Sequence, residues 1–185
     1  ILVSIWNSVS IALAVSIIIV ILSGILCSIY YFDRKKLIGQ LLLVSSFGYA
    51  FPGVILAIGV VTTAGFIDIQ IQRVAENVFS YAYTGGLTAG IGLVIFACVI
   101  RFQVIGYGSF KTGITRFSPN LIDSSRVLGA GFFTTSLKII FPLTVTSYLA
   151  AAILVFVEVI KELPMVLLLR PFNYETVSTL IYQLS

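Results

Sequence analysis

The sequence lacks histidine altogether, and charged residues, cysteine, methionine and tryptophan are scarce. Without histidine, these 185 residues hold no Ser-His or Cys-His catalytic pair, no HExxH zinc helix and no imidazole proton relay. This absence favours passage of a solute over chemistry, and it leaves pairs of intramembrane Asp or Glu residues as the remaining route to acid-base work. We therefore expect a protein that is not an enzyme and that holds no metal or cofactor of its own.

Charged residues make up 10% of the chain, whereas hydrophobic residues make up 59% and the mean hydropathy is +1.12. So little polar surface excludes a soluble globular protein. The net charge of +4 does not indicate a nucleic-acid partner, because the basic residues lie between apolar runs and form no continuous face. Cys27 and Cys98 both lie in apolar segments, which predicts neither a disulfide framework nor a metal site. The expected surroundings are a lipid bilayer.

Four apolar stretches are long enough to cross a bilayer, which takes about 20 residues. They cover approximately 5–32, 41–66, 86–107 and 143–160. The fold class expected from them is all-α: a polytopic membrane helix bundle in which residues 1–185 form one transmembrane domain. The chain begins in an apolar run without Met and stops without a polar tail, so we also expect it to be part of a longer protein.

The loops between these stretches alternate in charge. Residues 33–40 carry three basic residues against one acidic, 66–85 carry one against two, and 101–142 carry five against one. Because basic loops stay in the cytoplasm, the alternation orients all four spans consistently. The aromatic residues 30–32 precede the first basic turn, as in an interfacial belt. The sequence thus predicts a long cytoplasmic loop over about 108–142.

Proline and glycine interrupt the second predicted span at Pro52 and Gly53, in GYAFPGVILAIG. A proline inside a helix removes one backbone hydrogen bond and kinks the helix. Broken helices at that depth often line cavities, which is the functional interpretation. The structural interpretation is a kink whose glycines allow close helix packing. Both remain open at the level of sequence.

Three charged residues, Glu158, Lys161 and Glu162, lie at the end of the fourth span. Glu158 and Glu162 share one face of a helix, and Lys161 is spaced to pair with Glu158. Their carboxylates are candidates for lining a translocation pathway, with oxygens suited to a hard cation. The alternative is a helix end at the outer interface with a snorkelling lysine. Farther on, Arg170 and Glu175 are candidates for contacting an external binding protein.

The long basic loop contains DSSRVLGAGFFTTSLKIIFPL, residues 123–143. Ser118 and Pro119 predict a helix start, Gly129 its left-handed end, and the helix between them has about three turns. A second short amphipathic segment follows, and Pro142 is expected to stop it before the fourth span. These helices either dock to a partner or lie on lipid headgroups.

This loop resembles the signature loop of the membrane subunits of binding-protein-dependent ABC importers: Glu-Ala-Ala, three residues, Gly, nine residues, Ile, one residue, Leu-Pro. The seven motif positions here are Asp123, Ser124, Ser125, Gly129, Ile139, Phe141 and Pro142. Gly129, Ile139 and Pro142 are identical to the motif, and the loop lies ahead of the penultimate span as it does in the family. The tail, 156–185, and the stretch GYAFPGVILAIG look like the ferric iron group of these permeases, whose relatives carry thiamine, phosphonates and polyamines.

The resemblance implies a membrane subunit of an ATP-driven importer in the bacterial inner membrane, with ferric iron as the expected cargo. It implies that Asp123–Gly129 form a coupling helix that docks on a separate ABC ATPase subunit. ATP would be used there, since this chain has no GxxxxGK[ST] motif. An external solute-binding protein and a second permease half or copy are the other implied partners.

Two other classes of function stay in view. A secondary transporter or channel fragment would work without an ATPase and would place acidic residues deep within several spans, whereas the first three predicted spans carry none. A purely structural membrane subunit is the third class.

Overall fold

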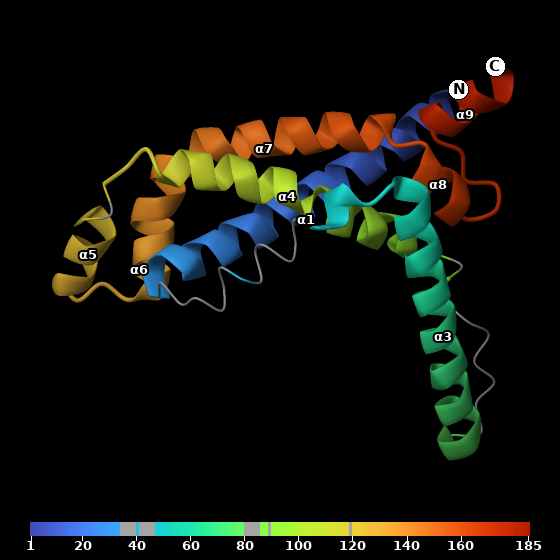
Figure 1. Ribbon diagram of the computed structural model, residues 1–185, viewed down its shortest axis with the longest axis horizontal. Coiled ribbons are helices and arrows are strands. Elements are labelled where there is room, and N and C mark those ends of the chain that lie inside the picture. The colour runs from blue at the N-terminus through green and yellow to red at the C-terminus, as the bar shows by residue number, and fades with distance from the viewer. Residues whose placement is uncertain (34–39, 41–46, 80–85, 89, 119) are drawn as a thin grey trace.

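The structure is a computed structural model that describes residues 1–33, 40, 47–79, 86–88, 90–118 and 120–185. Within those ranges it is helical and contains no β-strand (Figure 1). Its elements are α1 (Leu2–Asp33), α3 (Gly53–Phe79), α4 (Ile91–Ile114), α5 (Asn120–Val127), α6 (Phe132–Thr135), the π-helix η1 (Ser136–Ile140), α7 (Phe141–Lys161), α8 (Pro164–Leu169) and α9 (Val177–Leu184).

Four helices in the described part of the chain are long and apolar enough to cross a membrane. They cover Leu2–Phe32, Gly53–Asn77, Ile91–Ile114 and Phe132–Lys161, and have lengths of 31, 25, 24 and 30 residues. The expected all-α, polytopic membrane bundle is therefore confirmed, and the chain is a multi-pass membrane protein.

The second span was predicted at 41–66, and this position was wrong. Residues 41–46 lie outside the described residues, 47–50 are helical, the chain bends at Phe51, and α3 begins only at Gly53. Pro52 has no N–H, and its carbonyl accepts the N–H of Leu56 at 3.2 Å, so it stands where a helix can begin without losing a bond. Pro52 and Gly53 thus mark a break with a helix start rather than a kink inside one helix.

The third predicted span, 86–107, was placed too early, because α4 runs to Ile114. Lys111 of the expected loop, 108–142, therefore belongs to this helix. Lys111 reaches back over the ring of Tyr107, with Nζ 5.8 Å from the ring centroid. Such snorkelling lets a helix continue to the polar boundary without burying the charge. Arg101, which the charge count assigned to the loop, lies well inside α4.

Three helices, α1, α4 and α7, lie side by side and form the core of the bundle (Figure 1). Small residues let them approach closely, as at Gly106, where a Cβ would overlap Ile19 and Ser23. The Gln103 Nε2 donates to Ser23 Oγ at 2.9 Å, which joins α1 to α4 by a buried polar contact. The fully buried side chains of this core include Val15, Ile19, Val94, Phe102 and Val155.

Helix α3 departs from this core. It starts beside α4 and α8 and then runs away from the other helices (Figure 1). Only 17% of its most apolar stretch is buried, compared with 39% for α1 and α4. Thr62 and Thr63 donate their hydroxyls to carbonyls of their own helix, both at 2.7 Å, so these polar groups are bonded without another helix. Most of the apolar surface of α3 is left for lipid or for a partner.

A buried acid ties α3 to the chain that leads into α4. The carboxylate of Asp68, 8% exposed, accepts the backbone N–H groups of Leu87 at 3.3 Å and Thr88 at 3.1 Å, together with the Thr88 hydroxyl at 3.1 Å. Charge-assisted bonds of this kind are stronger than neutral ones. The expectation that the first three spans lack acidic residues was therefore wrong, because α3 extends beyond the predicted end of the second span.

We expect Asp68→Asn to lower the free energy of unfolding by about 1.5–3 kcal/mol, because a hydrogen bond to a charged group contributes that much. Chemical denaturation in detergent micelles measures it. Glu76→Gln is the matched control, since Glu76 is exposed on the same helix and bonds only to the Gln72 side chain in the part of the chain described. Equal stability of the two variants would contradict the role of Asp68.

Pro142 does not stop the helix before the fourth span. Residues from Phe132 to Lys161 form one continuous helical stretch, and the five residues before α7, Ser136–Ile140, form a π-helix. A π-turn widens the helix locally, which accommodates the proline ring and its missing donor. The chain turns sharply there, so that α6 points away from α7 (Figure 1). The predicted fourth span, 143–160, matches α7 to within two residues.

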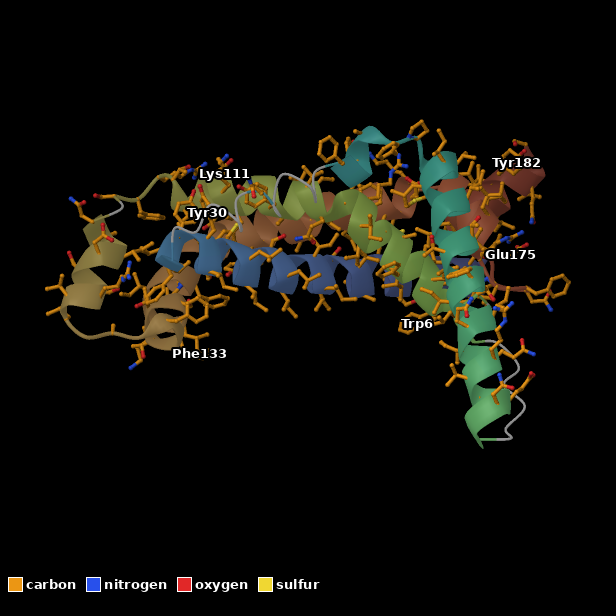
Figure 2. The ribbon with its side chains drawn as sticks, turned by 60° about the horizontal axis from the view of Figure 1, so that its bottom comes forward. Trp6, Tyr30, Lys111, Phe133, Glu175 and Tyr182 are labelled. Carbon is orange, nitrogen blue, oxygen red and sulfur yellow. The ribbon has the colours of Figure 1, made fainter. Side chains whose placement is uncertain are left out.

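The bundle has two distinct ends. Figure 2 shows Tyr30, Lys111 and Phe133 at one end and Trp6, Glu175 and Tyr182 at the other. The first end, called the basic end below, holds α5, α6 and the basic residues that follow Arg101 and precede α7: Lys111, Arg116, Arg126 and Lys138. The second, called the opposite end, holds α8, α9 and the first turns of α1.

Candidate functional site

At the basic end, α5 stands apart from the bundle (Figure 1). The Ser118 Oγ accepts the N–H of Asn120 at 3.3 Å, and the Ser118 carbonyl accepts the N–H of Leu121 at 3.1 Å. A serine before a helix satisfies donors that have no partner within the helix. Ser118 therefore caps α5 as predicted, while Pro119 lies outside the described residues. The helix has eight residues, so it is shorter than the three turns expected.

Gly129 ends α5. Its φ is +80°, and two bonds close the end: Ala130 N–H to the Ser125 carbonyl at 2.9 Å and Gly129 N–H to the Arg126 carbonyl at 3.0 Å. This pair of bonds is the Schellman motif, and the left-handed residue at its centre favours glycine. The predicted helix end at Gly129 is confirmed. The helix is thus closed at both ends by its own sequence.

The two serines of the motif have different surroundings. Ser124 is exposed, whereas Ser125 is 4% exposed and lies 3.1 Å from the Thr135 hydroxyl, Oγ to Oγ1. The Ser125 hydroxyl also donates to the Ile122 carbonyl at 2.8 Å. Ser125 therefore joins α5 to α6, and Ser124 faces outward. Asp123 is half-buried in the first turn of α5, where its charge suits the helix dipole.

Arg126 supplies a second anchor that the sequence did not reveal. Its Nη1 donates to the Phe32 carbonyl at 3.1 Å, and its guanidinium carbon lies 4.9 Å from the centroid of the Phe32 ring. These contacts tie α5 to the last turn of α1, 94 residues earlier in the chain. No spacing in the sequence indicates such a pair.

The motif residues Ile139 and Pro142 lie in the bend between η1 and α7, not on α5. Ile139 lines an apolar cavity of about 140 Å³ beneath α5, together with residues from α1, α4 and α7. Several large apolar side chains at the basic end remain exposed. They are Leu121, Val127, Leu128, Phe133 and Leu137, and we call them the basic-end apolar surface. An exposed apolar patch of this kind marks a contact with a partner or with membrane.

We expect Gly129→Ala to strain the end of α5 by about 1–2 kcal/mol, because a side chain disfavours the left-handed conformation. Hydrogen exchange of the α5 amides should become about 5 to 30 times faster, the factor that corresponds to such a free energy. Gly131→Ala is the control, since Gly131 has a φ of −75° and open space around it. Equal exchange in both variants would count against the cap.

At the opposite end, the three predicted pathway residues do not form one site. Lys161 Nζ donates to Glu158 Oε1 at 2.8 Å, which confirms the expected pair, and both side chains are partly exposed to solvent. Glu162, by contrast, is 7% exposed. Helix α7 ends at Lys161, and Glu162 has extended dihedral angles of −71° and 110°. Since Glu162 leaves the helix, it does not share a face with Glu158, and that prediction was wrong.

The side chain of Glu162 pairs with Arg101 instead. Glu162 Oε2 lies 3.6 Å from Arg101 Nε, and Glu162 Oε1 accepts the N–H of Met165 at 3.3 Å. Gly53 closes over this pair, because a Cβ there would overlap Arg101 Nη1 and stand 2.9 Å from Glu162 Oε1. The predicted break at Pro52 and Gly53 therefore lies against a buried charge pair. Sequence reasoning missed the pair because it counted Arg101 with the loop charges, although the predicted third span, 86–107, included the residue.

Arg170 and Glu175 also bond to other groups of this chain. Arg170 Nη1 lies 3.5 Å from Glu175 Oε1 and donates to the Tyr174 carbonyl at 3.4 Å, while the Glu175 carbonyl accepts from Asn7 Nδ2 at 2.9 Å. These bonds hold the turn before α9 against the start of α1. The tip of that turn, Phe172, is 95% exposed.

No group of three metal-ligating side chains occurs in the described ranges. No protein-family model matches the chain, and no curated protein matches it. The fold and these sites define a multi-pass helical membrane protein with a capped helix projecting from its basic end and a buried charge pair toward the other.

Proposed function

We propose that this chain is the membrane-spanning subunit of an ATP-driven importer of the ABC class in the bacterial inner membrane. In this proposal the chain forms part of the translocation pathway for a small solute, and α5 couples it to a separate ATPase subunit in the cytoplasm. The observation that carries the proposal is α5 itself: a short helix at the basic end, closed at Ser118 and Gly129, in the spacing of the importer signature loop.

The contacts of α5 suit a helix that transmits movement from a partner to the spans. Both ends are capped, and Ser125 and Arg126 anchor the helix to α6 and α1. Ser124 and Val127 remain exposed on it and Leu128 directly after it, and they supply a small polar side chain and two apolar ones for a groove of the ATPase. Since α6, η1 and α7 are continuous, a displacement of α5 reaches the spans along α7. Rigid-body movement of packed helices is a common form of such transitions.

Ferric iron is the proposed cargo, on the likeness of residues 156–185 to the ferric iron permeases. Carboxylate oxygens bind hard cations, and Glu158 offers one at the opposite end, where it is partly exposed and paired with Lys161. An external solute-binding protein would approach the same end, where Phe172 is one of the exposed apolar residues. The uncovered apolar face of α3 is the proposed contact with a second permease half or copy.

Ser124→Glu tests the coupling. We expect insertion into the membrane to be unchanged and ATP-dependent uptake in proteoliposomes to fall about tenfold, because a buried unpaired charge at an interface core costs more than 1.4 kcal/mol. Thr134→Glu is the matched control, since Thr134 is exposed on α6, outside α5. Wild-type uptake in the Ser124→Glu variant would contradict the assignment of α5.

A secondary transporter or channel fragment is the second candidate. Asp68 in α3 and the pair of Arg101 and Glu162 favour it, because ionisable residues within spans often carry protons or ions. The experiment that separates the two is co-purification of the full-length protein with a soluble ATPase. Uptake driven by an ion gradient without ATP would favour the second candidate.

A further inference from the structure

The pair of Arg101 and Glu162 lies where charges are costly. Arg101 belongs to α4 and Glu162 follows α7, two helices that can cross a membrane, and their side chains are 18% and 8% exposed. Taking two charges out of water costs several kcal/mol per ion, and their attraction compensates only when the geometry is good. A pair in this position is therefore weak evidence of a purely stabilising role.

The geometry of the pair is incomplete. At 3.6 Å, Arg101 Nε and Glu162 Oε2 are too far apart for a hydrogen bond. In the described part of the chain, neither Nε nor Nη1 of Arg101 has a hydrogen-bond partner, and both are buried. An arginine and a carboxylate make two parallel bonds when they are free to align. A small shift of Glu162 toward Arg101 would let the carboxylate accept the Nε–H, which has no partner now.

Glu162 is held back by a competing contact. Its Oε1 accepts the N–H of Met165 at the start of α8, and Gly53, where α3 begins, leaves no space on the other side. The carboxylate thus stands between Arg101 of α4 and the first turn of α8, and the start of α3 packs on both. Four helices converge on one carboxylate: α3, α4, α7 and α8.

Movement can reach this carboxylate through α7. The helix runs without interruption from the basic end, where η1 and α6 connect it to α5, to Lys161, the residue before Glu162. Beyond Glu162 the chain leaves the helical conformation and restarts at Pro164 as α8. Because packed helices shift as units, a displacement of α7 would also displace Glu162, the first residue after it.

We propose that Arg101 and Glu162 form a charge latch, in which the carboxylate changes partner between the α8 backbone and the Arg101 guanidinium when α7 moves relative to α4. In the structure the carboxylate is bonded to the α8 backbone and lies 3.6 Å from Arg101 Nε. When it bonds to Arg101, the end of α7 is joined to α4; when it stays on the Met165 N–H, the end of α7 is joined to α8. The cause of the movement rests on the proposed function, whereas the latch itself does not.

The thiol of Cys98 reports on the latch, because it is fully buried one turn before Arg101 in α4. Maleimide needs a water-accessible thiolate. In a Cys27→Ser background, in native membranes, we expect Glu162→Gln to raise the labelling rate of Cys98 about tenfold, since it leaves a buried arginine without its charge partner. The control Glu76→Gln makes the same chemical change on an exposed part of α3 and should leave the rate unchanged.

Exchange of the two charges separates the latch from a general loss of structure. The double variant Arg101→Glu with Glu162→Arg restores an attractive pair, so its labelling rate should return toward the Cys27→Ser parent. Labelling of Glu162→Gln at the rate of Glu76→Gln would overturn the proposal. The proposal would also be overturned if Cys98 were labelled in the double variant at least as fast as in Arg101→Glu alone or in Glu162→Arg alone.

The movement is tested in the importer assembled with its ATPase. We expect ATP to change the Cys98 labelling rate in the Cys27→Ser parent and to have no further effect in Glu162→Gln. An equal ATP effect in both proteins would overturn the change of partner. If the charge variants behave as expected but no ATPase co-purifies, the latch stands and the proposed function fails.

Discussion

Backbone hydrogen bonding in hydrocarbon constrains this molecule more than any other interaction. Lipid offers no partner to an N–H or carbonyl group, so spans are helical and breaks occur only where other groups compensate. The break before α3 uses Pro52, which has no donor, and Gly53, which packs on a charge pair. The break after α7 places the Glu162 carboxylate on the first turn of α8. These two breaks therefore each coincide with a polar side chain or a proline.

Helix α7 connects the two regions that these interruptions create. At one end it continues through a π-helix into α6, which Ser125 and Thr135 join to α5. At the other end it stops one residue before Glu162. One face of α7 packs on α1 and α4, with Ala151, Val155 and Val159 buried there, while its other face is exposed. Because of this placement, a displacement of α7 at the basic end would also displace its other end, next to the buried pair of Arg101 and Glu162.

Much of this arrangement was predictable from local signals. Hydropathy found four spans, and α7 matched its predicted range to within two residues. Gly129 ended α5 as expected, because a left-handed cap depends on one residue type. The errors arose where a helix end depends on distant groups. Pro142 was expected to stop a helix, yet a π-turn absorbs it, and hydropathy alone did not show that α4 continues to Ile114.

The sequence by itself determined the class of the protein, the number of spans, the alternation of the loops and the ends of α5, because these follow from composition and from contacts within a few residues. Tertiary structure alone decided which charges meet. Arg101 and Glu162 are 61 positions apart, and Arg126 reaches Phe32 across 94. Such pairs depend on how helices pack, and packing is decided by the shapes of whole faces rather than by any local pattern.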